Sequence, residues 1–127
     1  MEILVPTAAG ELIDKITILE IKSERIADAA KHANISRELE ALSRIAAKLP
    51  WTGELHELKA RLKSVNEAIW EIEDKVREAE HAKRFDAGFV ALARCVYQTN
   101  DKRAALKRDI NLKLGSSIVE EKSYAPY

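Results

Sequence analysis

Polar side chains interrupt an apolar seam in the C-terminal half of the chain. From Phe85 to Lys113 the seam residues are spaced alternately by three and four, and Thr99 and Arg103 occupy two of these positions, with Asn100 beside them. A polar group that faces a core without a partner costs about 1 to 3 kcal/mol. These residues therefore either line a polar pocket that binds a ligand or satisfy one another in a buried layer that fixes the helix register.

Residues from two other segments are expected at the same level. In an antiparallel helical hairpin that turns near residue 83, position 100 lies opposite Asn66, with Glu67 beside it. Glu20 lies on the flank of the apolar side of an N-terminal helix and is the expected acidic partner of Arg103. The candidate polar layer or ligand pocket therefore consists of Glu20, Asn66, Glu67, Thr99, Asn100 and Arg103.

Paired carboxylates raise a metal-binding alternative. Glu71 and Asp74 lie one helical turn apart, and Glu67 lies four residues before Glu71, so both spacings share a helix face. On facing helices such groups could hold magnesium and bind the phosphates of a nucleotide, as in the all-alpha nucleotide pyrophosphohydrolases. A solvated acidic face is the simpler interpretation. We therefore expect no metal, no cofactor and no catalytic residue unless this alternative holds.

A third hypothesis is a chorismate-mutase-like helical site. Such a site needs several cationic side chains that converge on a dicarboxylate. The nearest candidates are Arg25, Arg103 and Lys107.

Helical periodicity predicts the elements that position these residues. Eight apolar residues follow a heptad, or coiled-coil, spacing over 55–79, which keeps them on one side of a long helix. Similar patterns and breaks predict helices over about 10–30, 35–49, 53–80 and 86–114. We expect one all-α domain over residues 1–127, an antiparallel bundle of about four helices built on a long helical hairpin, with a short extended N-terminus and a C-terminal tail.

Composition excludes several classes of function. Charged residues make up 33% of the chain, and 21 Lys and Arg balance 21 Asp and Glu, so nucleic-acid binding through excess positive charge is not expected. No apolar run approaches the roughly 20 residues that span a bilayer, and a single cysteine forms no internal disulfide. We expect a cytoplasmic protein without a membrane span. Seam surface left uncovered at the ends of the hairpin would favour a homo-oligomer, most simply a dimer, or a protein partner.

Four stretches together resemble a family of small bacterial and phage proteins of unknown function. They are Gly10–Lys22 (GELIDKITILEIK), Val65–Asp74 (VNEAIWEIED), Phe89–Tyr97 followed by Asn100-Asp101, and Glu120–Tyr124 (EEKSY). The resemblance covers nearly the whole chain. It implies a compact helical protein, with some members near genes for surface polysaccharides, and it supplies no activity and no catalytic residues.

Abundant helical seams without a catalytic motif favour a non-enzymatic helical adaptor or assembly protein. The resemblance implies, through the gene neighbourhood of some members, that this role is an accessory one in bacterial surface-polysaccharide synthesis. The alternative is an enzyme that processes a small molecule or a nucleotide in a polar pocket of the bundle.

Overall fold

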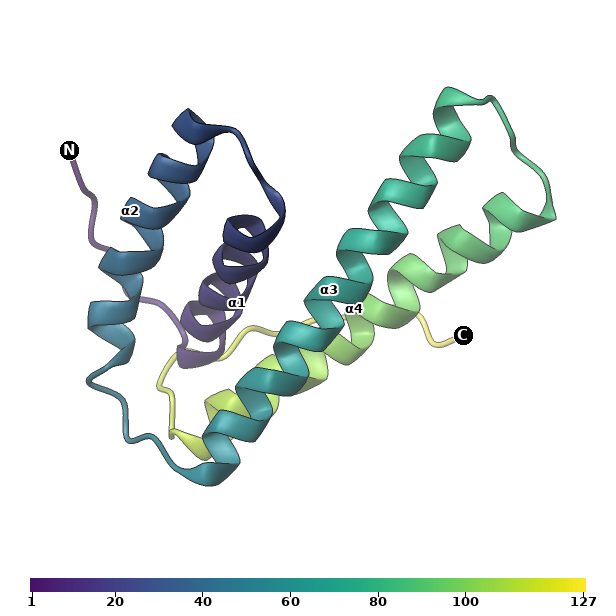
Figure 1. Ribbon diagram of the computed structural model, residues 1–127. Helices are drawn as coiled ribbons and strands as arrows, with labels where there is room; N and C mark the ends of the chain where they lie inside the picture. Colours follow the sequence, from purple (N-terminus) through teal and green to yellow (C-terminus); the bar gives the residue numbers. More distant parts are fainter.

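The computed structural model describes all 127 residues and contains four helices and no strand (Figure 1). They are α1 (Ala9–Arg25), α2 (Ala29–Ala46), α3 (Gly53–His81) and α4 (Ala87–Lys113). Residues 1–8 precede α1 without regular structure, and residues 114–127, here called the tail, follow α4. The expected all-α bundle on a long hairpin is therefore confirmed. None of the four helices combines the length and the apolar character that a membrane span requires.

Capping residues explain the bounds of the hairpin, which match the sequence prediction within one residue. The side chain of Thr52 accepts a hydrogen bond from the backbone N–H of Leu55 at 3.2 Å, and that of Asp86 accepts from Phe89 at 3.2 Å. Each bond satisfies an N–H that would otherwise lack a partner in the first helical turn. Gly115, with a φ of 61°, lies in the left-handed conformation that ends many helices.

The predicted boundary between the first two helices was wrong. α1 ends at Arg25 instead of about residue 30, and α2 begins at Ala29 instead of residue 35. The side chain of Asp28 caps α2 by accepting from the backbone N–H of Lys31 at 2.9 Å. The segment that was predicted as a polar break is therefore the first turn and a half of a helix that this cap starts.

α1 is the central helix, because α2 packs against it on one side and the α3–α4 hairpin on the other, whereas α2 packs against no other helix. The largest buried cluster joins α1 to the base of the hairpin and consists of Ile13, Leu55, Leu62, Leu106 and Ile110. α1 approaches α4 closely at Gly10, where a Cβ would collide with the backbone carbonyl of Lys107. The backbone N–H of Gly10 donates to Oδ1 of Asn111 at 2.6 Å.

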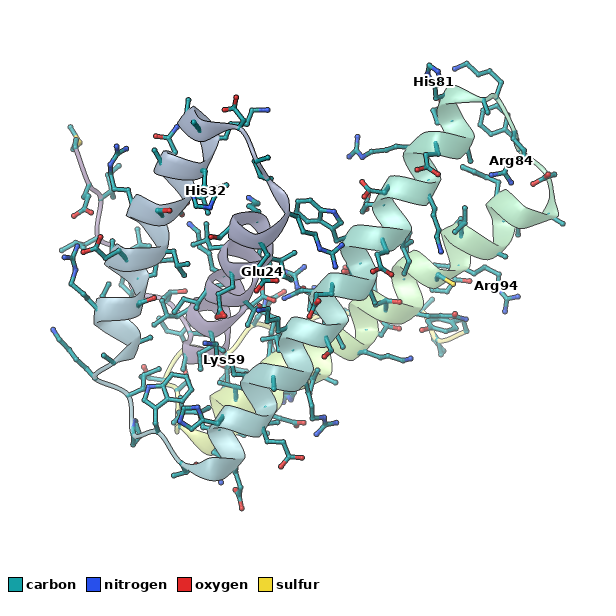
Figure 2. All side chains as sticks on the ribbon, in the orientation of Figure 1. Glu24, His32, Lys59, His81, Arg84 and Arg94 are labelled. Atoms are coloured by element: carbon teal, nitrogen blue, oxygen red, sulfur yellow. The ribbon has the colours of Figure 1, made fainter.

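The distal part of the hairpin, residues 67–103, projects beyond α1 and α2 and is here called the arm. Figure 1 shows the α3–α4 turn far from the first two helices. In Figure 2 the labelled side chains of His81, Arg84 and Arg94 extend from the arm into solvent. In the seam of α3, Leu55, Leu62 and Ala79 are fully buried, and the other members are half-buried: Leu58 and Val65 near α1, and Ile69, Ile72 and Val76 in the arm. The apolar seam therefore continues beyond the helix that covers it.

Candidate functional site

Asp14 is the centre of a buried polar layer that joins three helices. Its side chain on α1 is 2% exposed and accepts hydrogen bonds from Nε and Nη2 of Arg103 on α4, at 2.9 and 2.5 Å. Nδ2 of Asn66 on α3 donates to Asp14 Oδ1 and to Thr17 Oγ1, both at 2.9 Å. Thr17 Oγ1 in turn donates to the backbone carbonyl of Asp14 at 2.7 Å. Every helix except α2 therefore contributes to the layer.

The helical period places Asp14 in the interior. One stripe of α1 is spaced by four, three and four residues, and all of its members are buried: Gly10, Asp14, Thr17 and Ile21. This stripe, which is polar in its middle, faces the hairpin. The more apolar stripe that contains Ile16 and Leu19 is also buried, and Ile16 lies beside Ala46 of α2. The helix is buried on two faces, as expected for a central helix.

Within the layer, the negative charge of Asp14 is paired with the positive charge of Arg103. A buried carboxylate is stable only when it is paired and hydrogen-bonded, and the planar guanidinium of Arg103 supplies two parallel donors to Asp14. The hydrogen bond to Asp14 raises the pKa of Arg103 above its ordinary value, against the opposing effect of burial. The interaction therefore holds Arg103 charged and fixed in orientation.

Glu20 is not the acidic partner of Arg103, contrary to the prediction. Its carboxylate lies 2.8 Å from Lys59 Nζ and 3.8 Å from Lys63 Nζ, both on α3. Lys63 also bonds Glu24 at 2.5 Å, and Figure 2 labels Glu24 and Lys59 where α1 faces α3. The bond to Glu24, with the nearby charge of Glu20, raises the pKa of Lys63. These four residues form a separate half-exposed ion-pair network between α1 and α3.

The other predicted residues of the layer divide between two places. Asn66 and Arg103 belong to the layer, as expected, but no hydrogen bond joins Asn66 to Asn100. Asn100 is exposed on α4, and Thr99 is half-buried. Asn100 lines a cavity of about 600 Å³ between α4 and the tail, and Arg103, in addition to its bonds in the layer, lines the same cavity. The polar interruption of the seam therefore faces both the core and a cavity.

The carboxylates of the metal-binding alternative face a cation. Nη2 of Arg25 lies 3.7 Å from Glu67 and 3.6 Å from Glu71, and its guanidinium lies 5.8 Å from the centre of the Trp70 ring. Asp74 lines a smaller recess of about 280 Å³ with Trp70. Nowhere do three or more His, Cys, Asp or Glu side chains converge as a metal-ligating group.

The cationic residues of the chorismate-mutase-like hypothesis do not all line one cavity. Arg103 and Lys107 line the cavity between α4 and the tail, whereas Arg25 does not. Lys122 from the tail is its third cationic lining residue.

Ion pairs hold the tail against α4. Lys107 Nζ, whose side chain is only 13% exposed, lies 2.6 Å from Glu11 and 3.3 Å from Glu120. Glu120 also lies 3.0 Å from Lys122, and Tyr127 donates a hydrogen bond from its hydroxyl to Asp101. The ammonium groups of Lys122 and then Lys107 hold the pKa of Glu120 below its ordinary value. The tail therefore forms one wall of the cavity through charged contacts.

The amino-acid sequence matches the model of one known protein family. The model described as "Family of unknown function (DUF6165)" matches residues 3–127. The chain belongs to this family. The expected membership in an uncharacterised family is thus confirmed. No curated protein and no solved structure matches the chain.

Sequence reasoning missed two features of this DUF6165 member. The first is Asp14, whose spacing of three residues from Thr17 and four from Gly10 is a signal that could have located it on a buried stripe. The second is the contribution of the tail, which has no helical period and so offers no local signal of where it packs.

Proposed function

We propose that this chain is a non-enzymatic helical assembly protein in which the arms of two copies pair into an intermolecular four-helix bundle. The observation that carries the proposal is the continuation of the heptad seam beyond its cover. α1 packs along α3 from Leu55 to Glu71, where Arg25 pairs with Glu67 and Glu71, and the same spacing then continues for about 10 Å to Ala79 at 1.5 Å per residue.

The exposed apolar surface of the arm supports this proposal. Phe85 is 56% exposed and Val90 55% exposed, and the seam residues Leu92 and Val96 of α4 are only half-buried. Two helices alone bury one side of each seam, whereas a bundle of four buries a complete core. Pairing two arms would therefore remove apolar surface from water on both copies at once.

Charge complementarity favours a second copy as the partner. The α3 side of the arm, residues 67–80, carries six carboxylates and two cationic side chains, whereas residues 83–103 carry two carboxylates and five cationic side chains. Within the arm no ion pair joins α3 to α4: pairs such as Arg77 with Glu73 are local. The remaining ion pairs of the arm, those of Glu67, Glu71 and Arg103, are formed with α1. In a two-fold dimer the acidic side of each arm can face the basic side of the other.

An accessory role in surface-polysaccharide synthesis forms the second part of the proposal. It is supported by the resemblance to proteins encoded near such genes, and the exposed arm offers a surface for assembly. Affinity capture from the native host with wild-type and arm-variant baits tests this role. The role is supported if polysaccharide-synthesis enzymes are recovered with the wild-type bait and are absent with the arm-variant bait. Equal recovery of these enzymes with both baits would count against it.

Light scattering coupled to size exclusion tests the dimer. We expect wild-type protein to have twice the mass of one chain and Ile72→Lys to have the mass of a monomer, because a charge in the centre of the paired seam would be buried without a partner. Ile45→Lys is the matched control, since Ile45 is an exposed apolar residue of α2, 48% exposed and outside the arm.

Folding of each variant is measured by circular dichroism, so that loss of the dimer is distinguished from loss of the helices. A monomeric wild-type protein at concentrations up to the millimolar range would refute the proposal. So would an Ile72→Lys variant that is folded and still dimeric.

A further inference from the structure

We infer that the cavity between α4 and the tail binds a small phosphate ester that carries a flat ring, such as a mononucleotide. Its volume of about 600 Å³ lies within the range of roughly 300 to 1,000 Å³ that is usual for small-molecule sites. This inference does not depend on whether the arms pair. It rests on the charges, the free donors and the aromatic rings that line the cavity.

Three cationic side chains line the cavity. They are Arg103, Lys107 and Lys122, and Asp101, the single carboxylate side chain of the lining, already accepts the hydroxyl of Tyr127. Each cation is paired: Arg103 with Asp14, Lys107 with Glu11 and Glu120, and Lys122 with Glu120. A phosphate monoester, which carries about −1.5 to −2 at neutral pH, would therefore bind Lys107 and Lys122 in exchange for the carboxylate of Glu120.

Arg103 is prepared to bind an anion. A guanidinium has five N–H donors, and Arg103 uses one on Nε and one on Nη2 for Asp14. No other hydrogen bond within the protein uses its remaining donors, and its side chain, which is 29% exposed, lines both this cavity and the recess beside Trp70. Because Asp14 fixes the plane of the guanidinium, little conformational entropy is lost when a ligand binds the free donors.

The aromatic residues of the cavity offer a place for a ring. All three tyrosines of the chain line it, and the rings of Tyr97 and Tyr127 meet edge to face with centroids 4.9 Å apart. Tyr97 and Arg103 are six residues apart on α4, which is about 9 Å along the helix axis. A ligand with its ring near the tyrosines and its phosphate near Arg103 therefore has the extent of a mononucleotide.

Glu120 occupies the place of a competing anion. Its carboxylate bridges Lys107 at 3.3 Å and Lys122 at 3.0 Å, the two lysines that would also receive the phosphate. A ligand must share or displace these contacts.

Isothermal titration calorimetry with the full chain tests the inference, with AMP and UMP as probes. Adenosine supplies the ring without the phosphate, and ribose 5-phosphate and inorganic phosphate supply the phosphate without the ring. We expect a nucleotide to bind at least about tenfold more tightly than any of these parts. We expect Lys122→Gln to weaken nucleotide binding about five- to tenfold.

Lys102→Gln is the matched control, because Lys102 is an exposed lysine of α4 that does not line the cavity. Amide chemical shifts locate the ligand, with changes expected at residues 96–107 and 122–127. The inference is overturned if no nucleotide binds, if adenosine or phosphate alone binds as tightly, or if Lys122→Gln and Lys102→Gln have equal effects. Repeating the titration with Ile72→Lys separates this result from the association of the arms.

Discussion

The carboxylate of Asp14 on α1 accepts two hydrogen bonds from the guanidinium of Arg103 on α4, 89 residues further along the chain. The same carboxylate accepts a third bond from Asn66 on α3. One side chain thereby fixes the relative position of three helices. The layer also orients Arg103 toward the cavity, so the stability of the bundle and the proposed ligand site depend on the same contact.

Replacing Asp14 with Ala should destabilise the protein strongly. The change leaves Arg103 without its acceptor and Asn66 with Thr17 as its only one. Breaking a buried ion pair in this way costs about 3 kcal/mol or more. Urea unfolding followed by circular dichroism measures the loss. Glu38→Ala is the control, because Glu38 forms an exposed ion pair with Lys15 and should change stability by less than about 1 kcal/mol. Equal losses for the two variants would contradict the assigned role of Asp14.

Gly10→Ala tests the close approach of α1 to α4. The added methyl group would collide with the carbonyl of Lys107, and separating the helices would also disturb the bond from Gly10 to Asn111. We expect a loss of about 1 to 3 kcal/mol in the free energy of unfolding. At Gly53, in contrast, nothing lies within 4 Å of an added Cβ, so Gly53→Ala should be neutral or slightly stabilising. A Gly10→Ala variant as stable as wild type would show that the approach is looser.

If two copies associate through their arms, thermal stability should depend on protein concentration. Mass action stabilises a dimer as concentration rises, and we expect the Tm of the wild-type protein to increase by about 2 to 4 °C per tenfold increase. The Tm of Ile72→Lys should be independent of concentration. Differential scanning calorimetry over a hundredfold concentration range makes the comparison, and identical slopes for the two proteins would argue against association through the seam.

The tail should remain docked only within a defined pH range. Because Lys122 and Lys107 lower the pKa of Glu120 from 4.5, the contribution of Glu120 is present above pH 4.5 and is lost as pH falls through the lowered pKa. The hydrogen bond to Asp101 raises the pKa of Tyr127 from 10.0, so that contact is present below pH 10.0 and is lost as pH rises through the raised pKa.

Amide chemical shifts of residues 118–127, followed from pH 3 to pH 11, measure this docking. We expect one transition at each end of the range and none between. The Glu120→Gln variant should lose the acidic transition and keep the alkaline one, whereas an unchanged acidic transition would assign it to another carboxylate.

Local sequence patterns were sufficient for the hairpin and insufficient for the start of α2. The heptad over 55–79 and the caps Thr52 and Asp86 act within a few residues of each other, so they specify α3 and α4 almost to the residue. The predicted break at 28–34 was wrong because polarity alone does not end a helix. There a single side chain, that of Asp28, starts a helix rich in alanine.

The polar layer was predicted in part. The interrupted seam of α4 placed Arg103 in the layer, where it bonds Asp14. Asn66 was placed there because it lies opposite Asn100 in the hairpin, but it bonds Asp14 and Thr17 and not Asn100. Their acidic partner was predicted as Glu20 and is Asp14, six residues earlier on α1. Both carboxylates lie on the same helix, about 9 Å apart along its axis, so the axial position and the rotation of α1 together decide which one reaches Arg103.

The sequence by itself determined that the chain is helical, where the long hairpin begins and ends, and that polar groups enter its core, because these properties depend on periodicity and capping within single segments. The tertiary structure alone decided that α1 turns a stripe containing Asp14 toward the hairpin, that the arm extends beyond its cover, and that the tail closes a cavity over α4. These features arise from packing between residues far apart in the chain, where the collective burial of many side chains sets the position and rotation of each helix.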